Sequence, residues 1–188
     1  MKEPFLEPLL RRMRLRQVLP NIQAYPDCHL LDVGCGWEAK LLRMVEPYVA
    51  RGVGVDFKAP ELKTAKLETV SVVFNERLPF ASADFDVITM LAVLEHMDKP
   101  LEILRDCARL LRPGGTLLMT VPSWYAKPVL EFLSFRLGIV NPEEIRDHKR
   151  YFNREDLYEI FDQVEALAIV EHEYFQWRFN NRLVARKL

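Results

Sequence analysis

Two short segments place residues suited to ligand binding at the ends of apolar runs. Residues 30–36 read Leu-Leu-Asp-Val-Gly-Cys-Gly, a strand pattern that enters a glycine turn just before a helical pattern. Glycine lets a ligand approach the backbone, because no Cβ intervenes and because glycine adopts angles that other residues resist. Twenty positions beyond Gly36, a second strand pattern ends in Asp56, whose carboxylate can accept hydrogen bonds from both hydroxyls of a ribose. The two segments predict a ribose-containing ligand.

The same two segments leave the identity of the ligand open. Gly34, Gly36 and Ala39, followed by Asp56, also match the dinucleotide fingerprint of dehydrogenases. The rest of the chain must therefore decide between cofactors.

Four further motifs follow in order along the chain. They are Leu-Pro-Phe at 78–80, Asp-Phe-Asp-Val-Ile at 84–88, Leu-Glu-His at 94–96 and Leu-Leu-Arg-Pro-Gly-Gly at 110–115. Together with the glycine turn, this series resembles class I S-adenosylmethionine-dependent methyltransferases, and within them the methyltransferase type 11 group. The resemblance covers residues 29–121 well and the later part of the chain more loosely.

The resemblance implies a fold, a cofactor and a set of contacts. The fold is a Rossmann-like α/β sheet of seven strands in the order 3-2-1-4-5-7-6, with only strand 7 antiparallel and with helices on both faces. The cofactor is S-adenosyl-L-methionine, and no metal is implied. Carried over by position, the contacts are Asp32, Gly34 and Gly36 at the methionine part, Asp56 at the ribose, Phe57 at the adenine, and Leu78, Met90 and Leu91 along the walls.

Two positions depart from the family pattern. Glu38 stands where the family commonly has a third glycine, so its carboxylate either pairs with the ammonium of the cofactor or crowds the loop. Phe74 stands where the family usually has an aspartate facing the adenine amino group. Asn75 or Glu76 is the candidate to replace that aspartate.

Candidate catalytic residues are His96 and His148. Methyl transfer from a sulfonium has a neutral leaving group, so positioning and desolvation supply much of the acceleration and a base is optional. If the acceptor is a hydroxyl or an acidic carbon, an imidazole can take its proton near neutral pH. Each histidine equally fits a structural hydrogen bond or a solvated loop position.

The hydrophobic periodicity alternates between strand and helix patterns. Strands are expected at 29–33, 52–56, 70–75, 85–91 and 115–121, and helices at 38–45, 60–67, 100–111 and about 154–162, the last capped by Asn153. A basic helix over 4–19 should end at Pro20, and the chain should close with a hairpin turning near residues 173–176. The interpretation is one domain, in which 1–20 form a helix or lid, 28–121 the cofactor core, 122–152 an acceptor-side insertion and 153–188 the late helix and hairpin.

Composition restricts the class of protein. The 188 residues carry a formal net charge of −1, which provides no overall field for holding a nucleic acid. No stretch is long and apolar enough for a membrane span, and a cytoplasmic location is expected. Cys28, Cys35 and Cys107 have neither disulfide nor zinc spacing, so reduced thiols are expected.

The sequence thus predicts methyl transfer from S-adenosylmethionine to a small-molecule acceptor that no motif identifies. The alternatives are a non-catalytic adenosylmethionine-binding module, a subunit that supports a partner enzyme, and an NAD-dependent oxidoreductase. No second catalytic domain follows the sheet pattern, which argues against the oxidoreductase. Oligomeric state is not encoded in any of these patterns.

Overall fold

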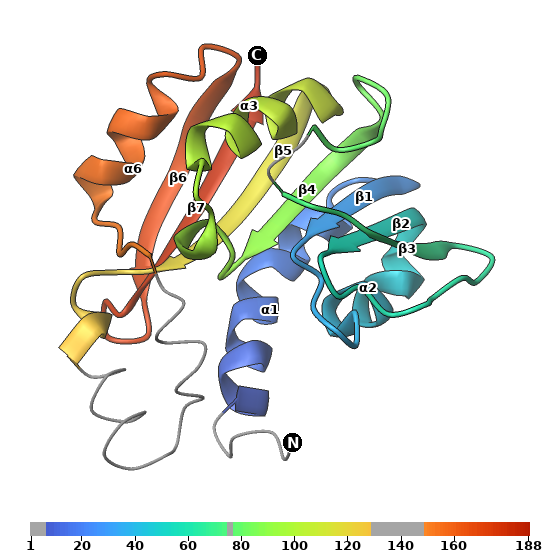
Figure 1. The fold of residues 1–188 in the computed structure, drawn as a ribbon, viewed down its shortest axis with the longest axis horizontal. Coiled ribbons are helices and arrows are strands. Elements are labelled where there is room, and N and C mark those ends of the chain that lie inside the picture. The colour runs from blue at the N-terminus through green and yellow to red at the C-terminus, as the bar shows by residue number, and fades with distance from the viewer. Residues whose placement is uncertain (1–6, 75–76, 129–148) are drawn as a thin grey trace.

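The computed structural model describes residues 7–74, 77–128 and 149–188, which form a seven-stranded sheet with helices on both faces (Figure 1). The strands are β1 Cys28–Val33, β2 Val49–Asp56, β3 Leu67–Ser71, β4 Phe85–Leu91, β5 Leu111–Pro122, β6 Leu167–Phe175 and β7 Asn180–Lys187. The helices are α1 Glu7–Gln23, α2 Lys40–Val45, α3 Pro100–Leu110 and α6 Arg154–Phe161, with 3-10 turns η1 Glu46–Tyr48 and η2 Leu94–His96.

The strand order is β3-β2-β1-β4-β5-β7-β6. Strand β1 pairs in parallel with β2 and β4, β2 with β3, and β4 with β5, whereas β7 is antiparallel to both β5 and β6. The predicted order and the single antiparallel strand are therefore confirmed. Because the strands that carry the glycine turn and Asp56 are adjacent and parallel, their carboxyl ends meet at one edge of the sheet.

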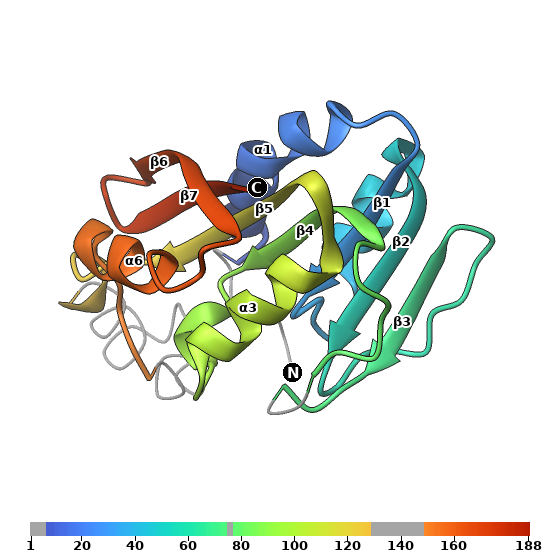
Figure 2. The same cartoon turned by 90° about the horizontal axis from the view of Figure 1, so that it is seen from above.

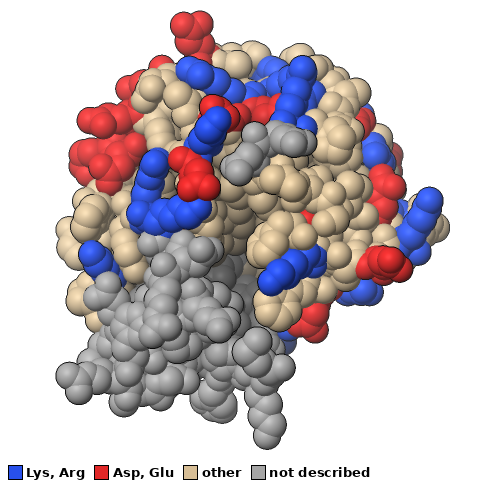
Figure 3. Space-filling model, viewed as in Figure 1, with Lys and Arg blue, Asp and Glu red and all other residues tan. Residues whose placement is uncertain are grey.

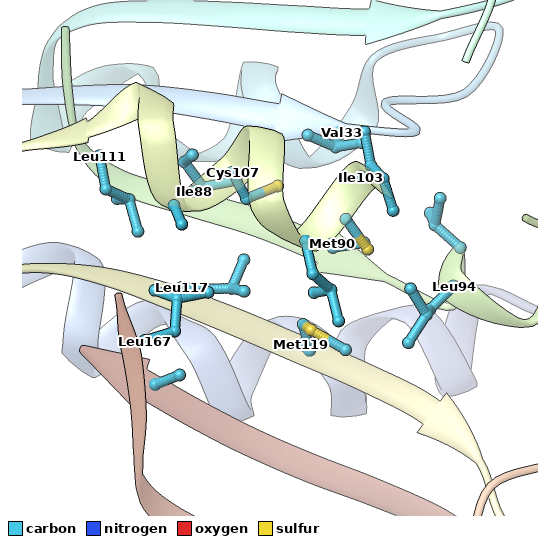
Figure 4. Close-up of a cluster of buried hydrophobic side chains, with 14 of the residues drawn as sticks. Val33, Ile88, Met90, Leu94, Ile103, Cys107, Leu111, Leu117, Met119 and Leu167 are labelled. Atoms are coloured by element: carbon cyan, nitrogen blue, oxygen red, sulfur yellow. The ribbon is translucent and has the colours of Figure 1, made fainter. Parts of the chain in front are cut away.

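Helices cover the two faces of the sheet in pairs, α3 with α6 and α1 with α2 (Figure 2). Successive strand residues point to opposite faces, so each buried strand supplies both layers. Leu31 and Ile88 belong to the cluster beneath α3 and α6, whereas their neighbours Leu30 and Val87 belong to the cluster beneath α1 and α2. Figure 4 shows the first cluster between α3 and the central strands. The apolar side chains of these strands are thus buried on both faces of the sheet.

Helix α1 differs from the prediction, because it continues through Pro20 to Gln23. Val18 and Ile22 are fully buried on either side of the proline, while Pro20 itself is exposed. Packing of this stripe against the sheet offsets the one backbone hydrogen bond that proline removes. The expected lid role of this helix stays a prediction.

The helix predicted over 60–67 is wrong. The segment instead folds back on β3, with an isolated antiparallel bridge between Lys63 and Glu68. The Thr64 hydroxyl accepts the N–H groups of Lys66 and Leu67, and Thr69 exchanges hydrogen bonds with Leu62. Such local bonds to threonine side chains compete with a helix. Strand β3 accordingly spans Leu67–Ser71 rather than the predicted 70–75.

The other expected elements are confirmed with small shifts of their ends. Helix α2 begins at Lys40 rather than at 38, because Ala39 adopts a left-handed conformation with φ of 47°. Helix α6 begins after Asn153, whose N–H donates to Asp156 Oδ2 at 2.7 Å. The terminal hairpin is present, and its turn lies at residues 176–179.

Asn181 on β7 fastens the end of β5 to the segment that precedes α6. Its side chain is 1% exposed, and Nδ2 donates to the carbonyl of Phe152 at 2.8 Å and to that of Val121 at 3.4 Å. Its Oδ1 lies 2.9 Å from His172 Nε2, which therefore carries the ring proton. One buried amide thus joins three parts of the chain.

Asn181→Ala should lower the free energy of unfolding by about 2 to 4 kcal/mol, because two buried carbonyls and one imidazole lose a partner. Chemical denaturation monitored by circular dichroism measures this loss. The matched control is Asn180→Ala, whose side chain has one hydrogen-bond partner among the described residues, the turn residue Gln176. Equal denaturation midpoints for the two variants would contradict the role given to Asn181.

Candidate functional site

The glycine turn after β1 folds over the ends of its two neighbouring strands. The N–H groups of Gly34 and Cys35 donate to the Val55 carbonyl on β2 at 2.8 and 3.1 Å. Gly34 has φ of +75°, and a Cβ built there would lie 2.3 Å from Val93 Cγ2 just past β4. Only glycine meets both conditions, so the turn is fixed where three strands end.

Gly36 is required for another reason. Its φ is +70°, yet a Cβ built on it would meet nothing within 4 Å. The face of the turn at Gly36 is therefore open, and a ligand can reach the backbone there.

Asp56 stands beside that open face and is 6% exposed. Its Oδ2 accepts the Gly36 N–H and its Oδ1 accepts the Lys58 N–H, both at 3.0 Å. Each carboxylate oxygen can accept more than one hydrogen bond, so the group can still receive ribose hydroxyls. Asp56 both shapes the turn and offers the acceptor that the sequence predicts.

Asp32, at the end of β1, is 3% exposed, and its Oδ1 lies 2.7 Å from Thr89 Oγ1 on β4. Burial raises the pKa of Asp32 to about 7; the nearby Asp56 also raises this pKa, while the hydrogen bond from Thr89 lowers it. The sequence did not single out Thr89. Its signal is the register, because Thr89 pairs directly with Asp32 across the two strands.

Cys35 lies in the turn but is not suited to act as a nucleophile. It is buried, and desolvation together with Asp32 and Asp56 raises the pKa of the thiol to about 12. The three cysteines are all free and buried, as expected.

The predicted wall residues lie at the end of β4 and in the loop between β3 and β4. The side chains of Leu78 and Met90 are 2% and 0% exposed and belong to the core under α3. The Leu78 N–H donates to Asp106 Oδ2 at 2.8 Å, so this loop is held by α3. Leu91 is half-buried at the end of β4. Asn75 and Glu76, the candidates for the adenine amino group, lie outside the described residues.

Glu38 forms an ion pair with Lys40. It is 69% exposed in its side chain, and its Oε2 lies 2.6 Å from Lys40 Nζ. Its pairing with a cofactor ammonium stays a prediction. Phe57, expected at the adenine, is 61% exposed beside Asp56.

His96 ends the η2 turn after β4 and is half-buried. The neighbouring Glu95 is 1% exposed, and its carbonyl accepts the N–H of Lys149, so the segment before α6 lies against this turn. His96 is thus placed at the edge of the sheet that carries the glycine turn. His148 lies outside the described residues, and the catalytic role of either histidine stays a prediction.

A cavity of about 540 Å³ opens at the end of β5. Its walls include the rings of Trp124 and Tyr151 and the cations of Lys127 and Arg150. Trp124 belongs to the aromatic segment that the sequence proposed as a pocket lining. Tyr125 instead packs its ring against Tyr174 at 6.5 Å.

The described residues contain neither a cluster of metal ligands nor a membrane-spanning helix. Within residues 7–74, 77–128 and 149–188, no group of three or more His, Cys, Asp or Glu side chains is arranged to hold a metal. No helix in these ranges is both long and apolar enough to cross a membrane. In Figure 3, basic and acidic side chains are interspersed over the visible described surface.

Comparison with known proteins gives a family match over residues 31–119, described as a methyltransferase domain. The match begins in β1 and ends in β5, so it contains the glycine turn, Asp56 and the end of β4. A ubiquinone biosynthesis O-methyltransferase from Aliivibrio fischeri (strain MJ11) is 27% identical over 168 residues, which cover 80% of this chain and 69% of that relative.

Solved structures share the fold at low sequence identity. A chain in the complex between the Haloferax volcanii Trm112 methyltransferase activator and a methyltransferase superposes with a TM-score of 0.72 at 16% identity, over 100% of this chain and 99% of that one. An S-adenosylmethionine dependent methyltransferase from Mesorhizobium loti gives a TM-score of 0.66 at 14% identity, over 91% and 98% of the two chains. At such identities these likenesses establish the fold alone.

Asp32→Asn should stabilise the protein at pH 8 and have little effect near pH 4. The raised pKa means that the folded state binds more protons than the unfolded state between pH 4 and 7, so ionisation destabilises the fold as pH rises. An amide has no proton to lose, and the gain should be a few kcal/mol, since one pKa unit corresponds to about 1.4 kcal/mol. Thermal unfolding across this range measures it, with exposed Asp162→Asn as control. A pH-independent difference would contradict this account of Asp32.

Proposed function

We propose that this chain transfers a methyl group from S-adenosylmethionine to a small-molecule acceptor, because residues 31–119 match a family described as a methyltransferase domain. The observation that carries the proposal is the open face of Gly36 directly beside the buried carboxylate of Asp56. A hydrogen bond joins the accessible backbone of Gly36 to the carboxylate of Asp56, which can accept hydrogen bonds from ribose hydroxyls.

The residues of the site fit this cofactor. Asp56 would hold the ribose, and the backbone of Gly34 and Gly36 would border the methionine part. Asp32 adds a buried carboxyl group whose ionised form a cationic ligand would favour.

The protein's contribution to the reaction is position and a dry environment. When bound, S-adenosylmethionine supplies an electrophilic methyl on a positively charged sulfur. The rigid turn, tied to Val55 and Asp56, fixes the site relative to the ends of β1, β2 and β4. Such positioning supplies a large part of the barrier reduction in a displacement reaction. If the acceptor is a hydroxyl, the imidazole of His96 would take its proton.

We propose that the acceptor is a small molecule that receives the methyl group on an oxygen atom. The relative from Aliivibrio fischeri is named an O-methyltransferase, which favours a hydroxyl acceptor here. The cavity bounded by Trp124 and Tyr151 is of the size that small-molecule sites have. The formal charge of −1 and the interspersed surface charges favour a small molecule over a nucleic acid.

S-adenosylhomocysteine should bind this chain and raise its melting temperature, because a ligand selective for the folded state stabilises it by mass action. At a ligand concentration 100 times the dissociation constant, the gain is about 2.7 kcal/mol. Thermal-shift measurements with S-adenosylhomocysteine, S-adenosylmethionine and NAD compare the candidate cofactors directly.

The result also separates the alternative functions. A shift with NAD and none with S-adenosylhomocysteine would overturn the proposal in favour of an oxidoreductase. Binding of S-adenosylmethionine without transfer to any hydroxyl acceptor would instead favour a binding module or a subunit that needs a partner.

Asp56→Ala should weaken S-adenosylhomocysteine binding by about 2 kcal/mol, or roughly 30-fold, because charge-assisted hydrogen bonds to the ribose are lost. The variant also loses the acceptor for Gly36 N–H, so its melting temperature should fall. Asp56→Asn keeps one oxygen and should lose less affinity. Unchanged affinity in folded Asp56→Ala, measured by calorimetric titration, would place the cofactor elsewhere.

A further inference from the structure

The cavity at the end of β5 has three basic side chains in its walls, and they differ in how their charges are paired. They are Lys127, Lys149 and Arg150. Lys149 Nζ lies 2.6 Å from Asp98 Oδ1, so an ion pair already neutralises this ammonium group. Lys127 and Arg150 are exposed, and within the described part of the chain neither forms an ion pair with a carboxylate. These two cations can therefore attract an anionic group of a bound molecule.

The aromatic wall of the cavity lies beside one of these cations. Lys127 Nζ lies 5.8 Å from the centre of the Trp124 ring and 6.0 Å from the centre of the Tyr151 ring, which is the range of cation–π contacts. The two rings are 6.3 Å apart and tilted by 43°. The cavity thus offers flat apolar surface and positive charge within a few ångströms of each other.

Two acids, Asp156 and Glu159, reach the same cavity from α6. Asp156 Oδ2 accepts the Asn153 N–H at 2.7 Å and the indole N–H of Trp124 at 3.3 Å, so this carboxylate caps the helix and holds the tryptophan ring. Glu159 lies about one turn further along α6 and is exposed. A bound anion should therefore contact the cations that come from outside α6, and Glu159 should oppose its binding.

Backbone hydrogen bonds join the cavity to the edge of the sheet that carries the glycine turn. The Lys149 N–H donates to the Glu95 carbonyl at 3.0 Å, in the η2 turn that ends at His96. The Phe152 N–H donates to the carbonyl of Pro122, the last residue of β5, at 3.2 Å. The segment that lines the cavity is thus fixed to the elements that follow β4 and β5, as a site for the second substrate requires.

We propose that the methyl acceptor is an aromatic acid, whose carboxylate binds to Lys127 and Arg150 and whose ring lies against Trp124 and Tyr151. This inference rests on the proposed function, because it assigns the cavity to the acceptor. A guanidinium group matches the two oxygens of a carboxylate, and aromatic rings pack well on one another. The two cations then select the acceptor by its charge, and they take no part in the transfer step.

A pair of probes that differ only in charge tests this selection. Hydroxyphenylacetate carries a carboxylate, whereas hydroxyphenylacetamide has the same ring and hydroxyl group without the charge. An ion pair at an exposed site corresponds to about a two- to fivefold change in affinity. With two such pairs, the natural chain should bind the acid roughly tenfold more tightly than the amide.

Calorimetric titration of both probes into the chain saturated with S-adenosylhomocysteine measures this preference. Lys127→Met and Arg150→Met should each weaken binding of the acid about two- to fivefold, and the double variant should lose the preference. Affinity for the amide should not change, which separates the loss of charge from a loss of packing on the rings. Lys127→Arg should keep the preference, and Glu159→Gln should strengthen binding of the acid.

Lys63→Met is the matched control for net charge. Lys63 is an exposed lysine beside β3, the strand at the opposite edge of the sheet from the β6–β7 hairpin, and it does not line the cavity. Its removal should leave the affinities for both probes unchanged. An equal loss of acid binding in Lys63→Met would overturn the inference by showing a general effect of charge.

The remaining outcomes separate the inference from the function on which it rests. If the natural chain binds S-adenosylhomocysteine but shows no preference for the acid, or binds neither probe, the inference is overturned and the proposed methyltransferase function stands. A preference that survives in the double variant would also overturn it, since the charge would then be bound elsewhere. Failure to bind S-adenosylhomocysteine would overturn the proposed function, and with it the assignment of the cavity to a methyl acceptor.

Discussion

The close approach of the glycine turn to three strand ends is the constraint on which the rest of the site depends. A side chain at Gly34 would clash with Val93, and the Gly34 N–H donates a hydrogen bond to the Val55 carbonyl. The next two N–H groups also donate to β2, the last of them to Asp56. A turn bound at successive positions has little freedom, so the open face at Gly36 is preformed rather than assembled around a ligand.

That arrangement explains why two acids can be buried so near each other. Asp56 accepts hydrogen bonds from two backbone N–H groups. Asp32 has one described hydroxyl partner, Thr89, and burial raises its pKa despite that hydrogen bond. The free chain thus has a poorly stabilised carboxylate at the end of β1 that a cation could neutralise.

Sequence patterns predicted what local physics determines strongly. Buried strands, the glycine turn and the cap at Asn153 follow from runs of apolar residues and from residue types with narrow conformational uses. The segment 60–67 was misread because its threonines bond to nearby backbone, which periodicity does not register. Helix α1 continues through Pro20 because burial of Val18 and Ile22 outweighs the tendency of proline to end a helix. Thr89 was missed because its partner Asp32 lies on another strand, and only the register of the fold brings the two together.

The two edges of the sheet are built for different purposes. At the amino ends of the strands, charges pair closely: Arg112 with Asp86 at 2.8 Å, and Arg51 with Asp84 and Glu68 at 3.0 Å. At the carboxyl edge lie all three tryptophans of the chain, Trp37, Trp124 and Trp177, which are 61%, 50% and 86% exposed. Leaving large rings in water costs free energy that packing would otherwise recover. The three tryptophans thus lie at the same edge of the sheet as the open glycine and the buried acids.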